Sequence, residues 1–304
     1  MQSVTTNLLR QLLALVFLAI AAATATAAPL KVVASFSILG DLAREVGGER
    51  IELHTLVGPD GDAHVYQPTP ADAKTIAQAN LVIVNGLGFE GWIDRLIKSS
   101  GYRGSVVRAS TGIKTLKLKH DEHGHGHDSD VDPHAWQDLS NALYYVDNIA
   151  QALAKADPAG QGVYQANAAK YKQAIVALDG ELKSAFNSIA REKRKVVTTH
   201  DAFGYFSRAY GIAFISPVGI NTDAEASAAD IGRIIKQIRR EKIPAVFMEN
   251  ISDPRLLERI RQESGARIGG VLYSDSLSKA DGPAATYVAM MRHNAKTLAS
   301  ALAN

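Results

Sequence analysis

Cysteine is absent from the 304-residue chain. Without cysteine no disulfide can form, so an exported form of the protein must be stabilised by its core. We also expect no lipid anchor, because such an anchor requires an acylated cysteine after the signal sequence. A strong excess of one charge is missing too, since 33 basic residues oppose 31 acidic ones. No basic stripe is found, so the sequence gives no indication of nucleic-acid binding.

Long hydrophobic runs are scarce, and the one that stands out lies near the N-terminus. There "LLALVFLAIAAA" follows a single basic residue, Arg10, and precedes small residues that place Ala25 and Ala27 in an A-x-A arrangement. The run is too short to span a membrane, and the pattern is typical of a secretory signal peptide. We therefore predict that residues 1–27 are removed and that the mature protein is free in the periplasm of a double-membraned bacterium.

The remaining composition, 46% hydrophobic and 21% charged, is typical of a globular protein. Eight short runs rich in Val and Ile, bounded by Gly, Pro or Asn, predict β-strands. They cover residues 31–36, 51–57, 81–86, 106–109, 195–199, 212–217, 245–250 and 268–273. Helical patterns lie between most of them. This alternation predicts an α/β fold with mostly parallel sheets covered by helices.

A weak internal repeat indicates two similar halves. "KVVASFSILGDLAREVGG" from Lys31 aligns without a gap with "KVVTTHDAFGYFSRAYGI" from Lys195. If each segment is the first strand–helix unit of a lobe, the boundary between the lobes lies before Lys195.

A long helix is predicted before that boundary, over residues 158–193. Apolar residues keep one face through a 4,3,4,3 spacing: Tyr164, Ala168, Tyr171, Ile175, Leu178, Leu182, Ala185 and Ile189. About 30 residues at about 1.5 Å each span roughly 45 Å, the length of a whole domain. We interpret this helix as a strut along both lobes rather than one more core helix. The predicted lobes are residues 28–157 and 194–304.

Histidines and aspartates gather in "HDEHGHGHDSDVDPHAW", which starts at His120. The segment 120–130 is polar, low in complexity and interrupted by glycine, so we expect a mobile surface loop. His134 lies just beyond it, between Asp132-Pro133 and the apolar Ala135-Trp136. An imidazole held at the edge of ordered structure can be placed accurately enough to bind a metal.

Three further polar residues follow predicted strands. His64 comes after 51–57, His200 follows "KVVTT", and Asp275 follows "IGGVLY". In open α/β sheets, ligands bind at the carboxyl ends of strands. A histidine in such a position can equally be a surface residue or a helix cap, and no local motif such as HExxH ties these residues together. From the residues alone, a metal site and an ordinary surface both remain open.

A family resemblance bears on this choice. "DAHVYQPTPAD", "VDPHAWQDLSNA", "TTHDAFGYFSRAYGI", "GINTDAEASAADI", "VFMENISDP" and "YSDSLS" resemble, in the same order, motifs of the metal-specific (cluster A-I) solute-binding proteins of bacterial zinc and manganese ABC importers. The resemblance implies two (β/α) lobes joined by one long rigid helix, with the metal in the cleft between the lobes. It also implies four metal ligands: His64, His134, His200 and Asp275.

The ligand set implied by the resemblance favours zinc. Three imidazoles and one carboxylate suit tetrahedral Zn²⁺. Manganese-type members of the family often carry glutamate where this chain has His200, although some members with three histidines also handle manganese. We therefore expect a monomer, not an enzyme, that captures periplasmic Zn(II), with Mn(II) as the alternative cargo. Its expected partner is an inner-membrane ABC permease, and a periplasmic zinc chaperone is a second candidate partner.

Residues around the ligands have candidate roles of their own. Four acids are candidates for orienting the imidazoles: Asp62, Asp132, Asp201 and Glu249. Asp132 can equally shape a turn before proline, and Asp201 can cap the helix that follows. Four histidines of the segment 120–130 are expected to capture zinc only transiently, because ordering a mobile segment costs entropy: His120, His123, His125 and His127.

Three other functions remain open from the sequence. A zinc hydrolase would need an open coordination position to activate water, and Asp275 as fourth ligand would close it. No GxSxG or HExxH motif is found. A surface adhesin is disfavoured by the missing lipid-anchor cysteine. A periplasmic zinc buffer that works without a transporter is the third alternative.

Overall fold

The computed structural model of the protein describes residues 28–118, 130–223 and 225–303. The predicted signal peptide lies outside these ranges, as do all four histidines assigned to the auxiliary loop. Within the described ranges, none of the helices combines the length and the apolar character needed to cross a membrane.

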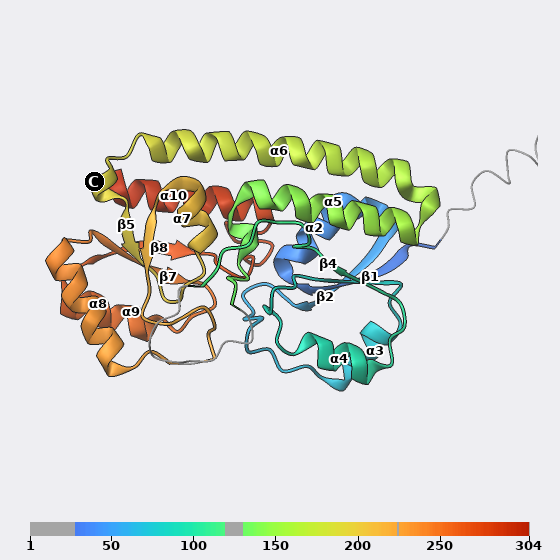
Figure 1. The fold of residues 1–304 in the computed structure, drawn as a ribbon, viewed down its shortest axis with the longest axis horizontal. Helices are drawn as coiled ribbons and strands as arrows, with labels where there is room; N and C mark the ends of the chain where they lie inside the picture. Colours follow the sequence, from blue (N-terminus) through green and yellow to red (C-terminus); the bar gives the residue numbers. More distant parts are fainter. Residues whose placement is uncertain (1–27, 119–129, 224, 304) are drawn as a thin grey trace, which may run out of the picture.

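Two parallel sheets of four strands form the framework of the protein (Figure 1). The first has the order β2-β1-β3-β4 and the second the order β6-β5-β7-β8. The strands are β1 (Leu30–Phe36), β2 (Ile51–Val57), β3 (Leu81–Val84), β4 (Ser105–Arg108), β5 (Lys195–Val197), β6 (Ala213–Ile215), β7 (Ala245–Glu249) and β8 (Arg267–Leu272). All eight predicted strands are confirmed. β3 is buried along its whole length, as expected of a central strand in a parallel sheet, whereas β4 at the edge of the same sheet is largely exposed.

The two sheets share the same strand order, which agrees with the two similar halves that the internal repeat indicates. Lys31 begins the repeat in β1 and Lys195 begins it in β5, and each of these strands is second in its sheet. A helix follows each of these two strands, directly after β1 and after a short loop following β5. The predicted α/β architecture of two lobes is therefore confirmed.

Helices cover both sheets. They are α2 (Ser37–Gly47), α3 (Pro70–Ala77), α4 (Ile93–Ser100), α5 (Leu139–Ala156), α6 (Gln161–Asn187), α7 (Gly204–Tyr210), α8 (Ala228–Glu241), α9 (Pro254–Ser264) and α10 (Tyr287–Ala303). Short 3-10 turns lie at Gly48–Arg50, Ala135–Gln137, Pro158–Gly160 and Arg191–Lys193. Polar caps begin several helices, and α3 starts with a capping box between Thr69 and Asp72.

The predicted long helix corresponds to α6, which runs above both lobes in Figure 1 with α5 and α10 beneath it. It is shorter than the predicted range 158–193, because a 3-10 turn follows Asp157 and the helix ends at Asn187. Its last turn also differs from the prediction, since Phe186 is buried there while Ala185 is exposed. A step of four from Leu182 keeps Phe186 on the apolar face, which is why the larger side chain takes the core position.

One hydrophobic core extends through both lobes. It contains side chains of β1 and α2 from the first half, of α5 and α6, and of α7 and α10 from the second half. A second, smaller core lies between the second sheet and helices α8 and α9. Moving the lobes apart would expose apolar surface of the shared core, so the architecture favours local rearrangement over wide hinge motion.

Asp41 links the two halves by a buried polar contact. Its Oδ2 atom accepts a hydrogen bond of 2.8 Å from the backbone N–H of Tyr287, the first residue of α10. A carboxylate at this helix end also interacts favourably with the helix dipole. Burial nevertheless raises the pKa of Asp41 to about 6. Arg44, at 3.2 Å from Oδ1, partly opposes this effect.

We expect the substitution Asp41→Asn to change how stability depends on pH. Between about pH 4 and pH 6 the native Asp41 keeps a proton that the unfolded chain has released, so the free energy of unfolding falls as pH rises through this window. The fall is on the order of 3 kcal/mol. Asparagine cannot ionise, but it keeps an acceptor oxygen. The variant should therefore lose this fall in the free energy of unfolding between about pH 4 and pH 6. Urea unfolding of the metal-free protein at several pH values measures it.

The control for this experiment is Asp94→Asn, at an exposed position of α4. Its pH profile should run parallel to that of the wild type. Parallel profiles for wild type and Asp41→Asn would show that Asp41 is not the source of the slope.

Candidate metal site

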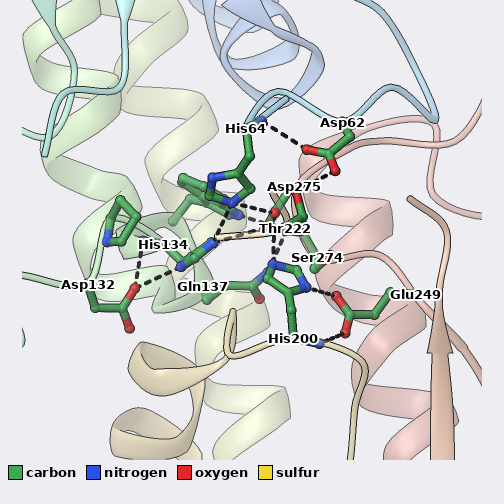
Figure 2. Close-up of polar contacts among 12 residues, drawn as sticks. Asp62, His64, Asp132, His134, Gln137, His200, Thr222, Glu249, Ser274 and Asp275 are labelled. Carbon is green, nitrogen blue, oxygen red and sulfur yellow. Dashed lines mark hydrogen bonds and ion pairs between the residues drawn. The ribbon is translucent and has the colours of Figure 1, made fainter. Parts of the chain in front are cut away.

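Four loops at the carboxyl ends of the strands bring the predicted ligands together. His64 follows β2, His134 follows β4 after a long connection, His200 follows β5 and Asp275 follows β8. One donor atom from each of these residues lies within 4.8 Å of the other three (Figure 2). Both sheets therefore contribute to one cluster, and its members are up to 211 residues apart in sequence.

The spacing of the donor atoms suits a single small cation. His64 Nε2 lies 3.2 Å from His134 Nε2 and 3.2 Å from Asp275 Oδ2. His200 Nε2 lies 3.0 Å from the same carboxylate oxygen. Tetrahedral zinc with bonds of about 2.0 Å places its donor atoms about 3.3 Å apart. The four side chains thus have the geometry that a shared ion requires.

The cluster is almost completely buried. Side-chain exposure is 2% for His64, 1% for His200 and 0% for Asp275. Burial alone would raise the pKa of Asp275, but the adjacent imidazoles of His134 and His200 hold it well below its usual range. The carboxylate is therefore ionised and available to a cation across the physiological pH range.

Two of the imidazoles are backed by carboxylates. The Nδ1 atom of His134 lies 2.8 Å from Asp132 Oδ1, and that of His200 lies 2.6 Å from Glu249 Oε2. A carboxylate at Nδ1 fixes the ring and directs Nε2 toward a metal, as in many zinc sites. Both contacts agree with the roles predicted for Asp132 and Glu249.

Proton affinity at these two rings is high without a metal. Burial would lower the pKa of His134, but Asp275 and Asp132 together raise it to about 9. For His200, burial is likewise outweighed by Glu249 and Asp275, and its pKa lies well above the usual value. Burial does dominate at His64, whose pKa is lowered. In the absence of metal, His134 and His200 therefore hold protons that a cation must displace.

The two remaining acids make other contacts. Asp62 Oδ1 accepts from the backbone N–H of His64 at 2.9 Å, and thus holds the main chain rather than the ring. Asp201 donates its backbone N–H to Gly219 O. In the described part of the chain, its carboxylate makes no hydrogen bond to a ligand imidazole and does not cap α7.

An aromatic wall that the sequence did not reveal lies beside the cluster. The ring of Phe89 packs edge-on against His64, with centroids 4.5 Å apart, and Trp136 packs similarly against His134 at 5.4 Å. Phe89 follows a turn in which Gly86, Leu87 and Gly88 all have positive φ. Such a backbone favours glycine, so the "NGLG" segment is the signal that could have indicated a sharp turn here.

A buried polar network positions the loop that carries His134. Glu90 is buried and accepts from Ser35 Oγ and from the backbone N–H of Asn85. Asn85 Nδ2 in turn donates to Pro133 O at 3.0 Å, and Tyr145 donates to Asn85 Oδ1 at 2.6 Å. The residue before His134 is thereby held by side chains of the first lobe.

Comparison with known proteins identifies the family. A family model described as zinc-uptake complex component A, periplasmic, matches residues 32–301. The chain belongs to this family. It is 34% identical over 279 residues to the manganese ABC transporter substrate-binding lipoprotein PsaA of Streptococcus pneumoniae, covering 90% of this chain and 89% of that one. It is also 34% identical over 274 residues to the iron-binding protein YfeA of Yersinia pestis, covering 90% and 86%.

A solved member of the same fold is the periplasmic zinc binding protein TroA from Treponema pallidum. The two structures agree with a TM-score of 0.85 and 31% sequence identity, over 91% of this chain and 100% of that one. The chain is thus a substrate-binding protein of a metal ABC transporter and not an enzyme, as predicted. The names of its relatives include manganese, iron and zinc, so they establish a divalent metal as the class of cargo.

Proposed function

We propose that this member of the zinc-uptake complex component A family captures Zn²⁺ in the periplasm with high affinity and delivers it to an inner-membrane ABC permease. The observation that carries the proposal is the donor set of three imidazole Nε2 atoms and one carboxylate within 4.8 Å. Nitrogen-rich, four-coordinate sites suit zinc, whereas magnesium and manganese favour more oxygen donors. Carboxylates behind His134 and His200 add the orientation that zinc sites use.

Manganese is the second candidate, and one contact favours it. Asp275 Oδ1 is buried and has no hydrogen-bond partner among the described residues, and it lies 3.6 Å from His134 Nε2. Both carboxylate oxygens could therefore bind one ion and raise the coordination number and oxygen share, as manganese prefers. The Streptococcus pneumoniae relative is named for manganese.

Metal content separates the two candidates. Zinc binds most N/O sites more tightly than manganese in vitro, so affinity alone cannot identify the physiological cargo. Protein isolated from the periplasm of cells supplied with both metals should contain one zinc ion per chain. Manganese in that preparation would overturn the zinc assignment, and a preparation without either metal would count against metal capture altogether.

The histidine-rich segment is proposed to be auxiliary. His120, His123, His125 and His127 precede the cluster in sequence, and none of the four proposed ligands belongs to their segment. We expect deletion of residues 120–130 to leave one tight zinc site and to remove only weaker binding. Calorimetric titration of the deletion variant beside the full chain measures both. Loss of the tight site would show that the segment supplies a ligand.

The proposal also covers export, the division into lobes and the oligomeric state. We propose that residues 1–27 direct export, that residues 28–157 and 194–304 form two lobes linked through residues 158–193, and that the protein acts as a monomer. Recovery of the protein in the osmotic-shock fraction would support a free periplasmic form. Recovery in the membrane fraction would contradict it.

A further inference from the structure

The three histidines of the cluster are not held equally. His134 and His200 each have a carboxylate at Nδ1 and are fully buried. In the described part of the chain, no carboxylate contacts Nδ1 of His64. Its position depends instead on the loop that carries it, and on the hydrogen bond from its backbone N–H to Asp62 Oδ1. His64 is therefore the ligand whose placement depends most on contacts of its main chain.

The loop around His64 borders the solvent. Residue Val65, next to the ligand, is 45% exposed, whereas the side chains of the other three ligands lie in the interior. Movement of this loop would open the otherwise buried cluster to solvent. The contacts that restrain the loop are therefore expected to slow the dissociation of a bound ion.

Two sets of hydrogen bonds restrain the loop at residues other than His64. Trp92 Nε1 donates to Ala63 O at 2.7 Å, within the first lobe. At the start of the loop, Asp60 donates its backbone N–H to Leu277 O and accepts from Asn250 Nδ2, so the loop is joined to the second lobe there. These contacts hold Asp60 and Ala63, on either side of Asp62, and do not involve Asp62 itself.

A third contact links the loop that carries His64 to the second lobe. Thr222 Oγ1 donates a hydrogen bond of 2.6 Å to Asp62 Oδ2, across 160 positions of sequence (Figure 2). The two oxygens of Asp62 thus hold different partners: one accepts from the main chain of His64, and the other accepts from the second lobe. Hydrogen bonds to a carboxylate are stronger than those between neutral groups, and this one is partly shielded from water.

We propose that Thr222 is a positioning residue which, through Asp62, holds His64 in place and slows dissociation of the bound metal. The inference rests on the proposed function, because it requires a metal at the cluster. Among the described residues, the Thr222 hydroxyl forms no hydrogen bond to a proposed ligand side chain. Its effect is therefore on how long the ion stays rather than on which ion is chosen.

The test uses the full chain loaded with zinc, and follows transfer of the ion to a chromophoric chelator. Thr222→Val replaces the hydroxyl by a methyl group of similar size, and should speed dissociation about tenfold while leaving association unchanged. Thr222→Ser keeps the donor and should restore slow dissociation. Thr75→Val is the matched control, since the Thr75 hydroxyl bonds only within its own helix, to Ala71 O.

A double variant shows whether the effect passes through Asp62. In an Asp62→Ala background, adding Thr222→Val should speed dissociation no further. A further increase there, or wild-type dissociation in Thr222→Val alone, would overturn the inference. Failure of the wild-type protein to bind zinc would instead overturn the proposed function, so the two failures are distinguishable.

Discussion

Replacing His200 with alanine is expected to lower zinc affinity by about 100- to 1,000-fold, since a four-ligand zinc site loses roughly a quarter of its binding free energy with one ligand. His200 Nε2 lies 3.0 Å from Asp275 Oδ2 and the residue is almost fully buried, so alanine removes one of the four donor atoms from a buried site. Competition with a chelator of known affinity measures the loss.

The matched control for this variant is His54→Ala. His54 lies on β2 at an exposed position, away from the cluster, and its loss should leave zinc affinity unchanged. Circular dichroism of the metal-free variants distinguishes loss of the ligand from loss of the fold. Wild-type affinity in folded His200→Ala would refute the ligand assignment.

Zinc affinity is also expected to fall about 100-fold for each pH unit below neutrality, because two protons compete with the ion. The pKa of His134 is about 9 and that of His200 is well above its usual value, so both imidazoles are protonated at pH 7 in the metal-free protein. The pKa of His64 is lowered, and this ring is neutral there. Affinity therefore rises with pH, and the rise ends only where pH passes the two raised pKa values.

Proton release can be counted directly. Calorimetric zinc titrations at pH 7 in two buffers with different ionisation enthalpies should show about two protons released per ion. In Asp132→Asn the count should move toward one, because Asp132 contributes to the raised pKa of His134. Zinc binding at pH 7 without proton release would contradict the protonation states inferred for the metal-free cluster.

Local sequence patterns were sufficient to predict most of the fold. Strands such as β3 consist of uninterrupted apolar residues bounded by turn formers, and the repeat at Lys31 and Lys195 indicated two similar halves. The ends of α6 were less predictable. Whether Ala185 or Phe186 completes its apolar face depends on the neighbouring Phe206 and Tyr210, which lie on α7 and pack against Phe186.

The candidate site was predictable in part. The positions of His64, His200 and Asp275 after strands indicated where ligands could lie, but their convergence with His134 came from the family resemblance. Their meeting is a property of two sheets and of the core between them, and no local spacing encodes it.

Contacts that depend on tertiary structure could not be predicted. Nothing around Thr222 indicates a partner 160 positions away, and nothing around Asn85 indicates that it holds the carbonyl of Pro133. For the same reason, neighbouring acids could not be told apart: Asp132 contacts a ligand ring, whereas the carboxylate of Asp201 forms no hydrogen bond to one within the described ranges.

The core shared through α6 affects how the permease can distinguish the metal-loaded protein from the metal-free protein. If the distance between the lobes stays fixed, the metal-loaded and metal-free proteins present nearly the same surface shape to the permease. Occupancy must then be recognised from a few side chains around the metal site. Empty copies would bind the permease as readily as filled ones, so import would slow whenever binding proteins outnumber the available metal ions.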